Sequence, residues 1–262
     1  MIEPRIIKNN KRIQAIEDAM FESGKVALKH FRHGEINYIQ KTTIHEITTP
    51  IDLEIEKLLK RTIKEQFPSD GILAEESPAE VEGTFWTVDP LDGSSYFQRG
   101  LADWSIHVAR IVDREVVIAM TLCPVTGEFF YSEKGKGTYL NDERINVSEK
   151  ENLNEGIFFF GHNYLRAAND LKSIELRKNV RAVWSTGSTA LALCNLAAGR
   201  LDIGVQTNQC YWDITGMLHV IEAGGKFTNW EGQMEYDQSG QKTNNILATN
   251  GKLHEIVLGN LF

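Results

Sequence analysis

The chain has neither a disulfide framework nor a cysteine zinc pattern. Its three cysteines, Cys123, Cys194 and Cys210, are widely spaced and odd in number. Such usage indicates reduced thiols and therefore a cytoplasmic protein. The first 14 residues are polar and basic without an apolar core, so we expect no signal peptide. No apolar run reaches about 18 residues, the length that a membrane span needs, and we expect no membrane association.

Positive charge is also scarce. The chain carries 28 Lys and Arg against 36 Asp and Glu, for a net charge of −8, and it has no long basic block. Binding to nucleic acid or to an anionic membrane needs a basic surface, so we expect neither partner. An acidic protein can still bind a phosphorylated small molecule where metal ions supply positive charge locally.

Hydrophobic periodicity outlines the organisation of the 262 residues. Amphipathic helices are predicted at about 8–33 and 52–66, with an edge hairpin from Ile36, Tyr38 and Ile44 between them. Short strands follow, and those after about residue 104 read as an antiparallel meander. A charged segment near 149–155 predicts a boundary between an N-terminal lobe, 1–150, and a C-terminal lobe, 151–262. Helices expected near 164–176, 188–198 and 212–223 alternate with strands, which predicts a layered α/β (α+β) fold.

The run from Trp86 to Ser95 has the clearest chemical signal. Asp89 and Asp92 stand three residues apart at the end of an apolar strand, where ionised groups are costly to desolvate without a partner. A divalent cation such as Mg²⁺, which prefers oxygen ligands, would be that partner. Gly-Ser-Ser at 93–95 can open a helix whose amides and hydroxyls face a phosphate. Metal beside phosphate predicts a phosphoester hydrolase.

Three further acidic positions stand at junctions of predicted elements. Asp52 and Asp213 open helices, and Glu75 follows an apolar strand. Each has a second interpretation: the two aspartates can be helix caps, and Glu75 can belong to a solvated turn. The run from Asp89 to Asp92 can itself be a turn, since Asp-Pro and Asp-Gly favour turns. The prediction of a site therefore rests on the whole set.

Two motifs resemble those of the inositol monophosphatase family. The sequence Asp89-Pro-Leu-Asp-Gly-Ser94 is similar to its first signature, and Trp212–Gly216, continued by Glu222–Gly225, is similar to its second. Glu75-Glu76-Ser77 resembles its acidic pair, and residues 41–52 its upstream segment. The resemblance covers nearly the whole chain. It implies a layered αβαβα sandwich, two or three Mg²⁺ ions, a homodimer and, as in many members, sensitivity to lithium.

The resemblance also implies roles for single residues. It implies that the metal ions are bound by the main-chain carbonyl of Leu91 and by four carboxylates, those of Glu75, Asp89, Asp92 and Asp213. It gives catalytic roles in activating a water to Glu75, Asp52 and Ser94, the last standing where the family usually has threonine. It gives contact with the substrate to Asp92, Gly93, Ser94, Ser95, Ser188, Thr189, Gln206 and Asp213.

The function implied is a Mg²⁺-dependent phosphomonoesterase for a small phosphorylated polyol, most similar to inositol 1-phosphate. Gln206 stands where the inositol enzymes of the family carry a glutamate, so fructose 1,6-bisphosphate, histidinol phosphate and nucleotide 3′-phosphates stay open as substrates. The segment 185–190 resembles a substrate-side loop but is equally a helix N-cap. The alternative to an enzymatic function is a mainly regulatory, protein-binding role, as a member of the same family. His107 and His219 read as packing residues, and an aspartyl-nucleophile phosphatase is disfavoured by the Asp spacing.

Overall fold

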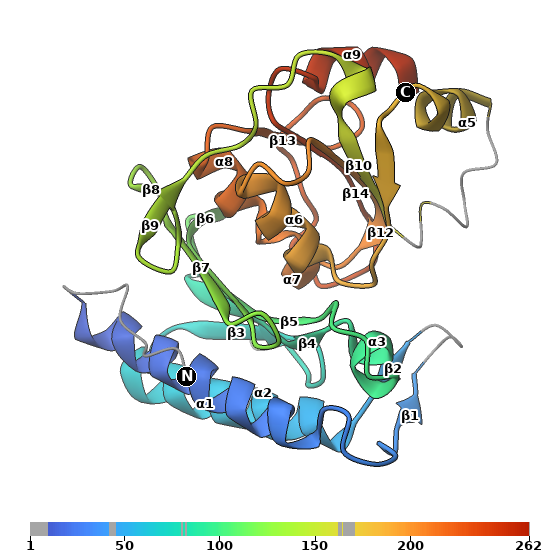
Figure 1. Cartoon of the computed structure of the whole chain (residues 1–262). Coiled ribbons are helices and arrows are strands. Elements are labelled where there is room, and N and C mark those ends of the chain that lie inside the picture. The colour runs from blue at the N-terminus through green and yellow to red at the C-terminus, as the bar shows by residue number, and fades with distance from the viewer. Residues whose placement is uncertain are drawn as a thin grey trace.

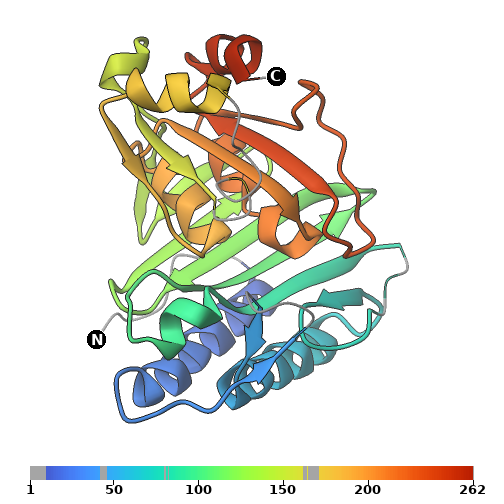
Figure 2. The same ribbon diagram turned by 90° about the vertical axis from the view of Figure 1, so that its right-hand side faces the viewer.

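The computed structural model describes residues 10–41, 46–79, 81, 83–161, 164 and 171–261. Helices and sheets alternate in five layers, α, β, α, β and α (Figures 1 and 2). The first layer holds α1 (Lys11–His30) and α2 (Pro50–Gln66), and the middle layer holds α6 (Thr189–Ala197), α7 (Tyr211–Ile214) and α8 (Met217–Glu222). The last holds α5 (Leu171–Lys178) and α9 (His254–Leu261), while the short α3 (Ser94–Gln98) follows β4. The layered αβαβα sandwich is thereby confirmed.

The larger sheet has seven strands in chain order from β3 to β9. They are β3 (Gly71–Ala74), β4 (Phe85–Asp92), β5 (Ser105–Val112), β6 (Glu115–Cys123), β7 (Glu128–Glu133), β8 (Gly137–Leu140) and β9 (Glu143–Ile145). β3 runs parallel to β4, and every later neighbour is antiparallel. The predicted meander is confirmed, with left-handed turn residues at Asp113, Gly127 and Gly135.

The smaller sheet has five strands in the order β11-β10-β12-β14-β13. They are β10 (Ile157–Phe160), β11 (Ala182–Trp184), β12 (Ile203–Gln209), β13 (Lys226–Thr228) and β14 (Asn244–Thr249). The chain leaves the larger sheet at Ile145 and enters the smaller one at Ile157, after a short 3₁₀ turn at Leu153–Glu155. The sheets thus change near the predicted lobe boundary, although α6, α7 and α8 of the second half pack against strands of the first.

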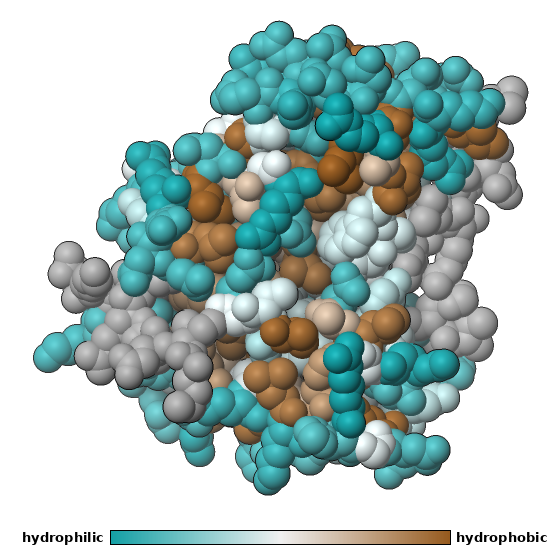
Figure 3. All heavy atoms as spheres, in the orientation of Figure 1, coloured by the Kyte–Doolittle hydropathy of each residue, from teal (hydrophilic) through white to brown (hydrophobic). Residues whose placement is uncertain are grey.

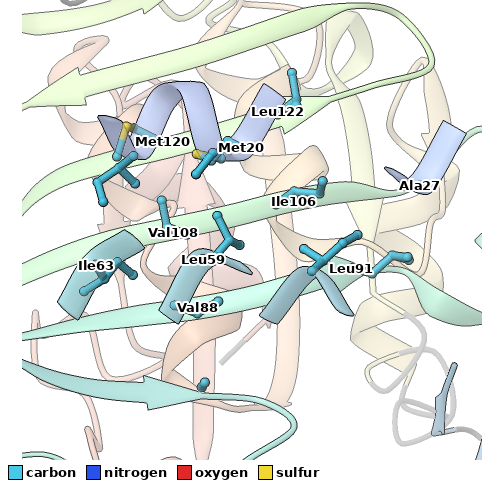
Figure 4. Close-up of a cluster of buried hydrophobic side chains, with 14 of the residues drawn as sticks. Met20, Ala27, Leu59, Ile63, Val88, Leu91, Ile106, Val108, Met120 and Leu122 are labelled. Carbon is cyan, nitrogen blue, oxygen red and sulfur yellow. The ribbon is translucent and has the colours of Figure 1, made fainter. Parts of the chain in front are cut away.

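The outer face of the seven-stranded sheet is closed by α1 and α2. Figure 4 shows Met20 of α1, Leu59 and Ile63 of α2 and apolar side chains of β4, β5 and β6 meeting in one cluster. The helix α2 begins two residues before its predicted start. Thr49 caps it together with Asp52, and Pro50 occupies the first turn, where its missing N–H costs nothing.

Several predicted boundaries need correction. The helix expected at 8–33 ends at His30, since Arg32 and then Gly34 adopt left-handed conformations. The edge hairpin is formed by β1 (Ile39–Gln40) and β2 (Ile47–Thr48), with Tyr38 exposed outside it. Ile44 lies outside the described residues. The helix expected near 164–176 is described only at residue 164 and from 171 onward, as α5.

The prediction of a single helix at 212–223 is wrong. The chain makes two short helices, α7 and α8, that part at Thr215 and Gly216. The Thr215 hydroxyl donates to the Trp212 carbonyl at 3.1 Å, which competes with a continuous helix. At Gly216 an added Cβ would lie 3.3 Å from Leu193, so the backbone approaches α6 closely there. The motif Trp212–Gly216 therefore contains the end of α7 and the break before α8.

Burial agrees with several of the sequence expectations. All three cysteines are buried and unpaired. His107 and His219 are fully buried, and burial lowers the pKa of His107 to about 3 and that of His219 well below its usual value. None of the helices described here is long and apolar enough to cross a membrane.

Apolar side chains that reach the surface are scattered along the chain. The face in Figure 3 is largely hydrophilic over the end that carries α5 and α9, and apolar atoms show between the layers. The most exposed large apolar residues, Ile39 and Met234, belong to the small hairpin and to the loop before β14. Single exposed apolar residues of this kind are ordinary in globular proteins.

We predict that Asp70 is a main anchor of the larger sheet. Its buried carboxylate accepts hydrogen bonds from Trp86 Nε1 at 3.1 Å and Arg110 Nε at 2.8 Å. Asp70→Ala would leave a buried donor and a half-buried charge unpaired, so it should lower the free energy of unfolding by about 2–4 kcal/mol. Urea denaturation measures this. Glu22→Ala, which removes an exposed ion pair with Lys25, is the control and should cost no more than about 0.5 kcal/mol.

Candidate functional site

A β-bulge places Asp89 and Asp92 on the same face of the larger sheet. Strand residues alternate between faces, so residues three apart normally point to opposite sides. On β5 their partners are His107 and Ser105, only two residues apart, so β4 holds one extra residue between the two aspartates. Leu91 takes the opposite direction and packs in the cluster of Figure 4. The Asp-Pro-Leu-Asp spacing is thus a bulged strand rather than a loop turn.

The smaller sheet has the same device in β12. Gln206 pairs with Ile246 and Gln209 with Asn244, so three residues again face two. Asn208, inside the bulge, has a left-handed φ of 54°. Both glutamines consequently line the cavity that Asp89 and Asp92 line from the other sheet. The two bulges bring polar pairs from the two sheets to one place.

The cavity between them has a volume of about 160 Å³. Of the site residues predicted from the sequence, it is lined by Glu75, Asp89, Leu91, Asp92, Gly93, Ser94, Ser95, Thr189, Gln206 and Asp213. Asp52 and Ser188 lie just behind this wall, bonded to Ser94 and Asp92 respectively. The structure therefore brings the whole predicted set into one region.

Burial makes the carboxyl groups of this cavity hard to ionise together. The pKa of Asp89 is raised well above its usual value, first by burial and then by the charges of Glu75, Asp92 and Asp213. Burial, with nearby carboxylates adding to it, raises the pKa of Asp92 to about 7 and that of Asp213 to about 8. At neutral pH the group therefore retains protons unless a cation compensates its charge.

The Asp92 carboxylate also holds the start of α6. It accepts hydrogen bonds from the Ser188 hydroxyl at 2.6 Å and from the Ala190 amide at 2.7 Å, with the Thr189 amide at 3.3 Å. A carboxylate at a helix N-terminus is favourable because the unpaired amides carry partial positive charge. The hydroxyl and amide groups at the start of α6 were expected to face a substrate. In the structure they donate to Asp92 instead. The N-cap interpretation of Ser188 is confirmed as well.

Glu75 and Asp213 likewise have protein partners. Lys41 Nζ lies 2.8 Å from Glu75 Oε1 and 2.6 Å from Glu76 Oε1, and these carboxylates raise the pKa of Lys41. The Asp213 carboxylate accepts from the Cys210 amide at 2.7 Å and so caps α7. Capping, the alternative interpretation of Asp213, is therefore present in the structure, and the same holds for Asp52.

Asp52 and Ser94 form a buried pair across α2 and α3. The Ser94 hydroxyl lies 2.7 Å from Asp52 Oδ1 and 2.9 Å from the Leu91 carbonyl, and both of these oxygens accept. Burial raises the pKa of Asp52, while hydrogen bonds from Thr49 and Ser94 oppose the rise. Gly93 precedes Ser94 with φ 103°, and an added Cβ would lie 2.8 Å from the Asp103 carbonyl. Only glycine fits this turn, which fixes where Ser94 stands.

The donor set suits a hard divalent cation. Carboxylates and a carbonyl oxygen are the ligands that Mg²⁺ prefers, and a cation would relieve the mutual repulsion described above. In the described ranges no three His, Cys, Asp or Glu side chains already stand in a metal-holding arrangement. Each carboxylate is turned toward a protein donor instead, so the metal ligands remain predictions from the sequence.

Further residues of the cavity wall have no clear signal in the sequence. They include Glu46, Ile47, Tyr96, Asn208, Gln209 and Lys242, whereas Thr186 and Gly187, which also line the cavity, belong to the segment 185–190 expected on the substrate side. Gln209 was detectable in principle, because it follows Gln206 at the same spacing as Asp92 follows Asp89. Lys242 was not, since it stands in a loop 196 residues from Glu46, with which it pairs at 2.5 Å.

Comparison with known proteins identifies the family of this chain. The model of the inositol monophosphatase family matches residues 8–261. The fructose-1,6-bisphosphatase/inositol-1-monophosphatase of Thermotoga maritima is 34% identical over 85% of this chain and 85% of its own. The Nus factor SuhB of Xylella fastidiosa is 29% identical over 88% of this chain and 87% of its own. The solved inositol monophosphatase of Thermotoga maritima superposes with a TM-score of 0.84 at 31% identity, over 92% of this chain and 93% of that one.

We predict that the protein without divalent metal loses stability as pH rises from 6.5 to 8. The raised pKa values mean that the folded state keeps protons on Asp92 and Asp213 that the unfolded state has released. The free energy of unfolding therefore falls as pH rises. The slope is about 1.4 kcal/mol per pH unit for each retained proton, or about 2 kcal/mol between pH 6.5 and 8. The lowered pKa of His107 acts in the opposite direction, but only below about pH 6.5.

Urea unfolding in EDTA at several pH values measures this slope. Asp213→Asn should flatten part of it, since the pKa values of Asp89 and Asp92 are raised as well, whereas Asp18→Asn, on an exposed part of α1, should leave it unchanged. A wild-type stability that stays level or rises between pH 6.5 and 8 would show that the carboxyl groups are ionised in the free protein.

Proposed function

The chain belongs to the inositol monophosphatase family and is a phosphatase of phosphate monoesters, and we propose that it hydrolyses a small phosphorylated polyol with Mg²⁺ as cofactor. The observation that carries this proposal is the crowding of Glu75, Asp89, Asp92 and Asp213 around one small cavity. A phosphate monoester is an anion and would be repelled by these carboxylates alone. With divalent cations between them, the same carboxylates become a phosphate-binding site.

Asp52 and Ser94 are suited to orient the attacking water. The Ser94 hydroxyl has acceptors at Asp52 and at the Leu91 carbonyl, so its proton is directed inward. Its oxygen is then free to accept a hydrogen bond from a water in the cavity, and Asp52 keeps the hydroxyl in that orientation. When bound, Mg²⁺ supplies positive charge that acidifies a coordinated water and neutralises the phosphate.

Gln206 supports a substrate with a hydroxyl group. Its Nε2 donates to Thr189 Oγ1 at 2.8 Å, and the Thr189 hydroxyl in turn donates to Gln209 Oε1 at 2.7 Å. This chain fixes the amide orientation and leaves Gln206 Oε1 buried without a partner among the described residues. A buried acceptor without a partner is costly, so a ligand that offers a hydroxyl there gains affinity. A second phosphate at that place, which only accepts, would not.

The unpaired Gln206 Oε1 favours an inositol 1-phosphate type of substrate over a sugar bisphosphate. The name of the Thermotoga maritima relative includes both activities, which supports testing both. Histidinol phosphate and nucleotide 3′-phosphates are the remaining alternatives. A homodimer and a cytoplasmic location are further parts of the proposal; the buried, unpaired cysteines support a reducing compartment.

A regulatory role is the second candidate, because two relatives are named Nus factors. A protein-binding role would not need the carboxylates to be intact. If an inactive Asp213→Asn protein restores the growth of cells that lack the wild-type chain, the regulatory role is supported. If only active protein does so, the enzymatic role is the one the cell uses.

Phosphate release tests the proposed enzyme. We expect Mg²⁺-dependent turnover of inositol 1-phosphate well above that of fructose 1,6-bisphosphate, histidinol phosphate and adenosine 3′,5′-bisphosphate, with loss of activity in EDTA. Asp92→Asn should lower kcat/KM at least about a hundredfold, because a lost metal ligand removes several kcal/mol of charge stabilisation.

Asp202→Asn is a matched control for that variant. Asp202 is also a buried carboxylate that accepts from a serine hydroxyl, Ser148, and from a backbone amide, that of Ile157, but it does not line the cavity. It should lose stability yet keep its activity. Full activity in Asp92→Asn, or turnover that EDTA does not affect, would contradict the proposal.

We also predict that Gly161 sets the position of Gln206. A Cβ added at Gly161 would lie 1.3 Å from Gln206 Oε1, so alanine must displace that oxygen. Gly161→Ala should raise KM for inositol 1-phosphate about tenfold, the cost of one unmade hydrogen bond, while inhibition by inorganic phosphate stays unchanged. Gly204→Ala in the neighbouring strand is the control, because its nearest contact would be an ordinary 3.5 Å. Equal KM values in the two variants would argue against a role for Gln206.

A further inference from the structure

A chain of buried hydrogen bonds crosses the larger sheet, starting at Thr87, two residues before Asp89. It includes two histidines and five hydroxyls, all of them shielded from solvent: Thr87, Thr215, His107, Thr121, His219, Ser132 and Thr138. These come from five neighbouring strands, β4 to β8, and from the segment of α7 and α8. The distances between successive partners are 3.0, 2.9, 2.7, 3.0, 2.6 and 2.9 Å.

The far end of this chain fixes the direction of every proton in it. The Thr138 hydroxyl donates to the His219 carbonyl at 2.7 Å, so it must accept from Ser132. Ser132 has then used its only proton and must accept from Nδ1–H of His219. A neutral imidazole has one N–H, so His219 Nε2 must accept from Thr121.

The proton directions toward the near end of the chain follow from these. Having donated to His219, Thr121 accepts from Nδ1–H of His107 at 2.7 Å. His107 Nε2 then accepts the Thr215 proton at 2.9 Å, which the Trp212 carbonyl shares at 3.1 Å, and Thr215 accepts from Thr87 at 3.0 Å. Both rings are therefore Nδ1–H tautomers, and one arrangement of protons satisfies all seven groups. A network with a single arrangement is rigid.

The near end lies directly beside two of the predicted metal ligands. Thr87 stands two residues before Asp89 on β4, and His107 is the cross-strand partner of Asp89, so all three share one face of the sheet. Thr215 follows Asp213 by two residues, just after α7 ends. The contacts of Thr215 with Thr87 and His107 thus join the backbone that carries Asp89 to the backbone that carries Asp213.

The helix α7 needs such an anchor. It has only four residues, and a helix of this length has too few internal hydrogen bonds to be stable by itself. The chain also breaks at Gly216, where its backbone lies close to His107: an added Cβ would be 3.8 Å from His107 Cε1. Besides the core packing of Tyr211 and Ile214, the position of Asp213 relative to Asp89 therefore depends on Thr215 and its partners rather than on a long helix.

We propose that Thr215, Thr87 and His107 are positioning residues that set the separation of the Asp89 and Asp213 carboxylates for divalent-metal binding. This inference rests on the proposed metal-dependent function. Partners behind metal ligands typically change metal affinity by about 10–100-fold when removed. Thr215→Val, which keeps the side-chain shape but removes the hydroxyl, should weaken Mn²⁺ binding about tenfold or more. Thr215→Ser should restore it to within about threefold.

The experiment measures Mn²⁺ binding by electron paramagnetic resonance, together with the Mg²⁺ concentration for half-maximal phosphate release. Thr249→Val is the matched control, because Thr249 is also a buried hydroxyl bonded to a buried histidine, His254, at 3.0 Å, but in the smaller sheet. It should lose comparable stability with metal affinity within about twofold of wild type. Equal metal affinity in Thr215→Val and Thr249→Val would reduce the network to a structural role and overturn the inference.

Two further measurements keep the test decisive. If Thr215→Val does not fold, Thr87→Val can replace it, because it removes only the terminal donor of the chain. Thr87→Val should also weaken metal binding, but by a smaller factor. Nitrogen-15 spectra of the wild-type rings should show His107 and His219 protonated on Nδ1, and protonation on Nε2 would overturn the argument. If the wild type binds Mn²⁺ and needs Mg²⁺ for activity, and Thr215→Val has the same metal affinity, only this inference is refuted. If the wild type neither binds Mn²⁺ nor needs Mg²⁺, the proposed function is refuted as well.

Discussion

The mutual repulsion of buried carboxylates is the constraint on which this site depends. Glu75, Asp89, Asp92 and Asp213 come from three separate parts of the chain and line one cavity of about 160 Å³. Their charges cannot be dispersed into solvent, so they must be balanced by protons, by protein donors or by cations. The free protein uses the first two: raised pKa values, and partners such as Lys41 and the start of α6. The proposed Mg²⁺-dependent phosphatase would use the third.

The fold meets this constraint by geometry that is rigid on every side. One bulge in each sheet puts residues three apart on the same face, which gives the cavity two aspartates from β4 and two glutamines from β12. The Asp92 carboxylate docks on α6, and the threonine–histidine chain connects the short α7 to four further strands beyond β4. Because these supports come from both sheets and the middle helices, the site belongs to the whole sandwich rather than to one lobe.

Sequence patterns predicted the layers, the meander and the set of acidic residues, because these depend on local signals. Alternation of apolar residues identifies β5 and β6, and turn residues such as Asp113 and Gly127 mark where the strands reverse. The bulges were not predicted, since period-two alternation gives Asp89 and Asp92 opposite faces. Nor was the break at Thr215, because a hydroxyl that bonds across the fold to His107 has no local signature. Lys242 was missed for the same reason, as its partner Glu46 is remote in sequence.

Divalent cations are expected to replace protons on these carboxyl groups. Proton release on Mg²⁺ binding tests this expectation directly, by calorimetry at pH 7 in buffers of different ionisation enthalpy. With Asp92 and Asp213 protonated in the free protein to about pH 7 and 8, binding should release about one proton or more. The release should fall toward zero above about pH 9. Mg²⁺ binding without proton release at pH 7 would contradict the account.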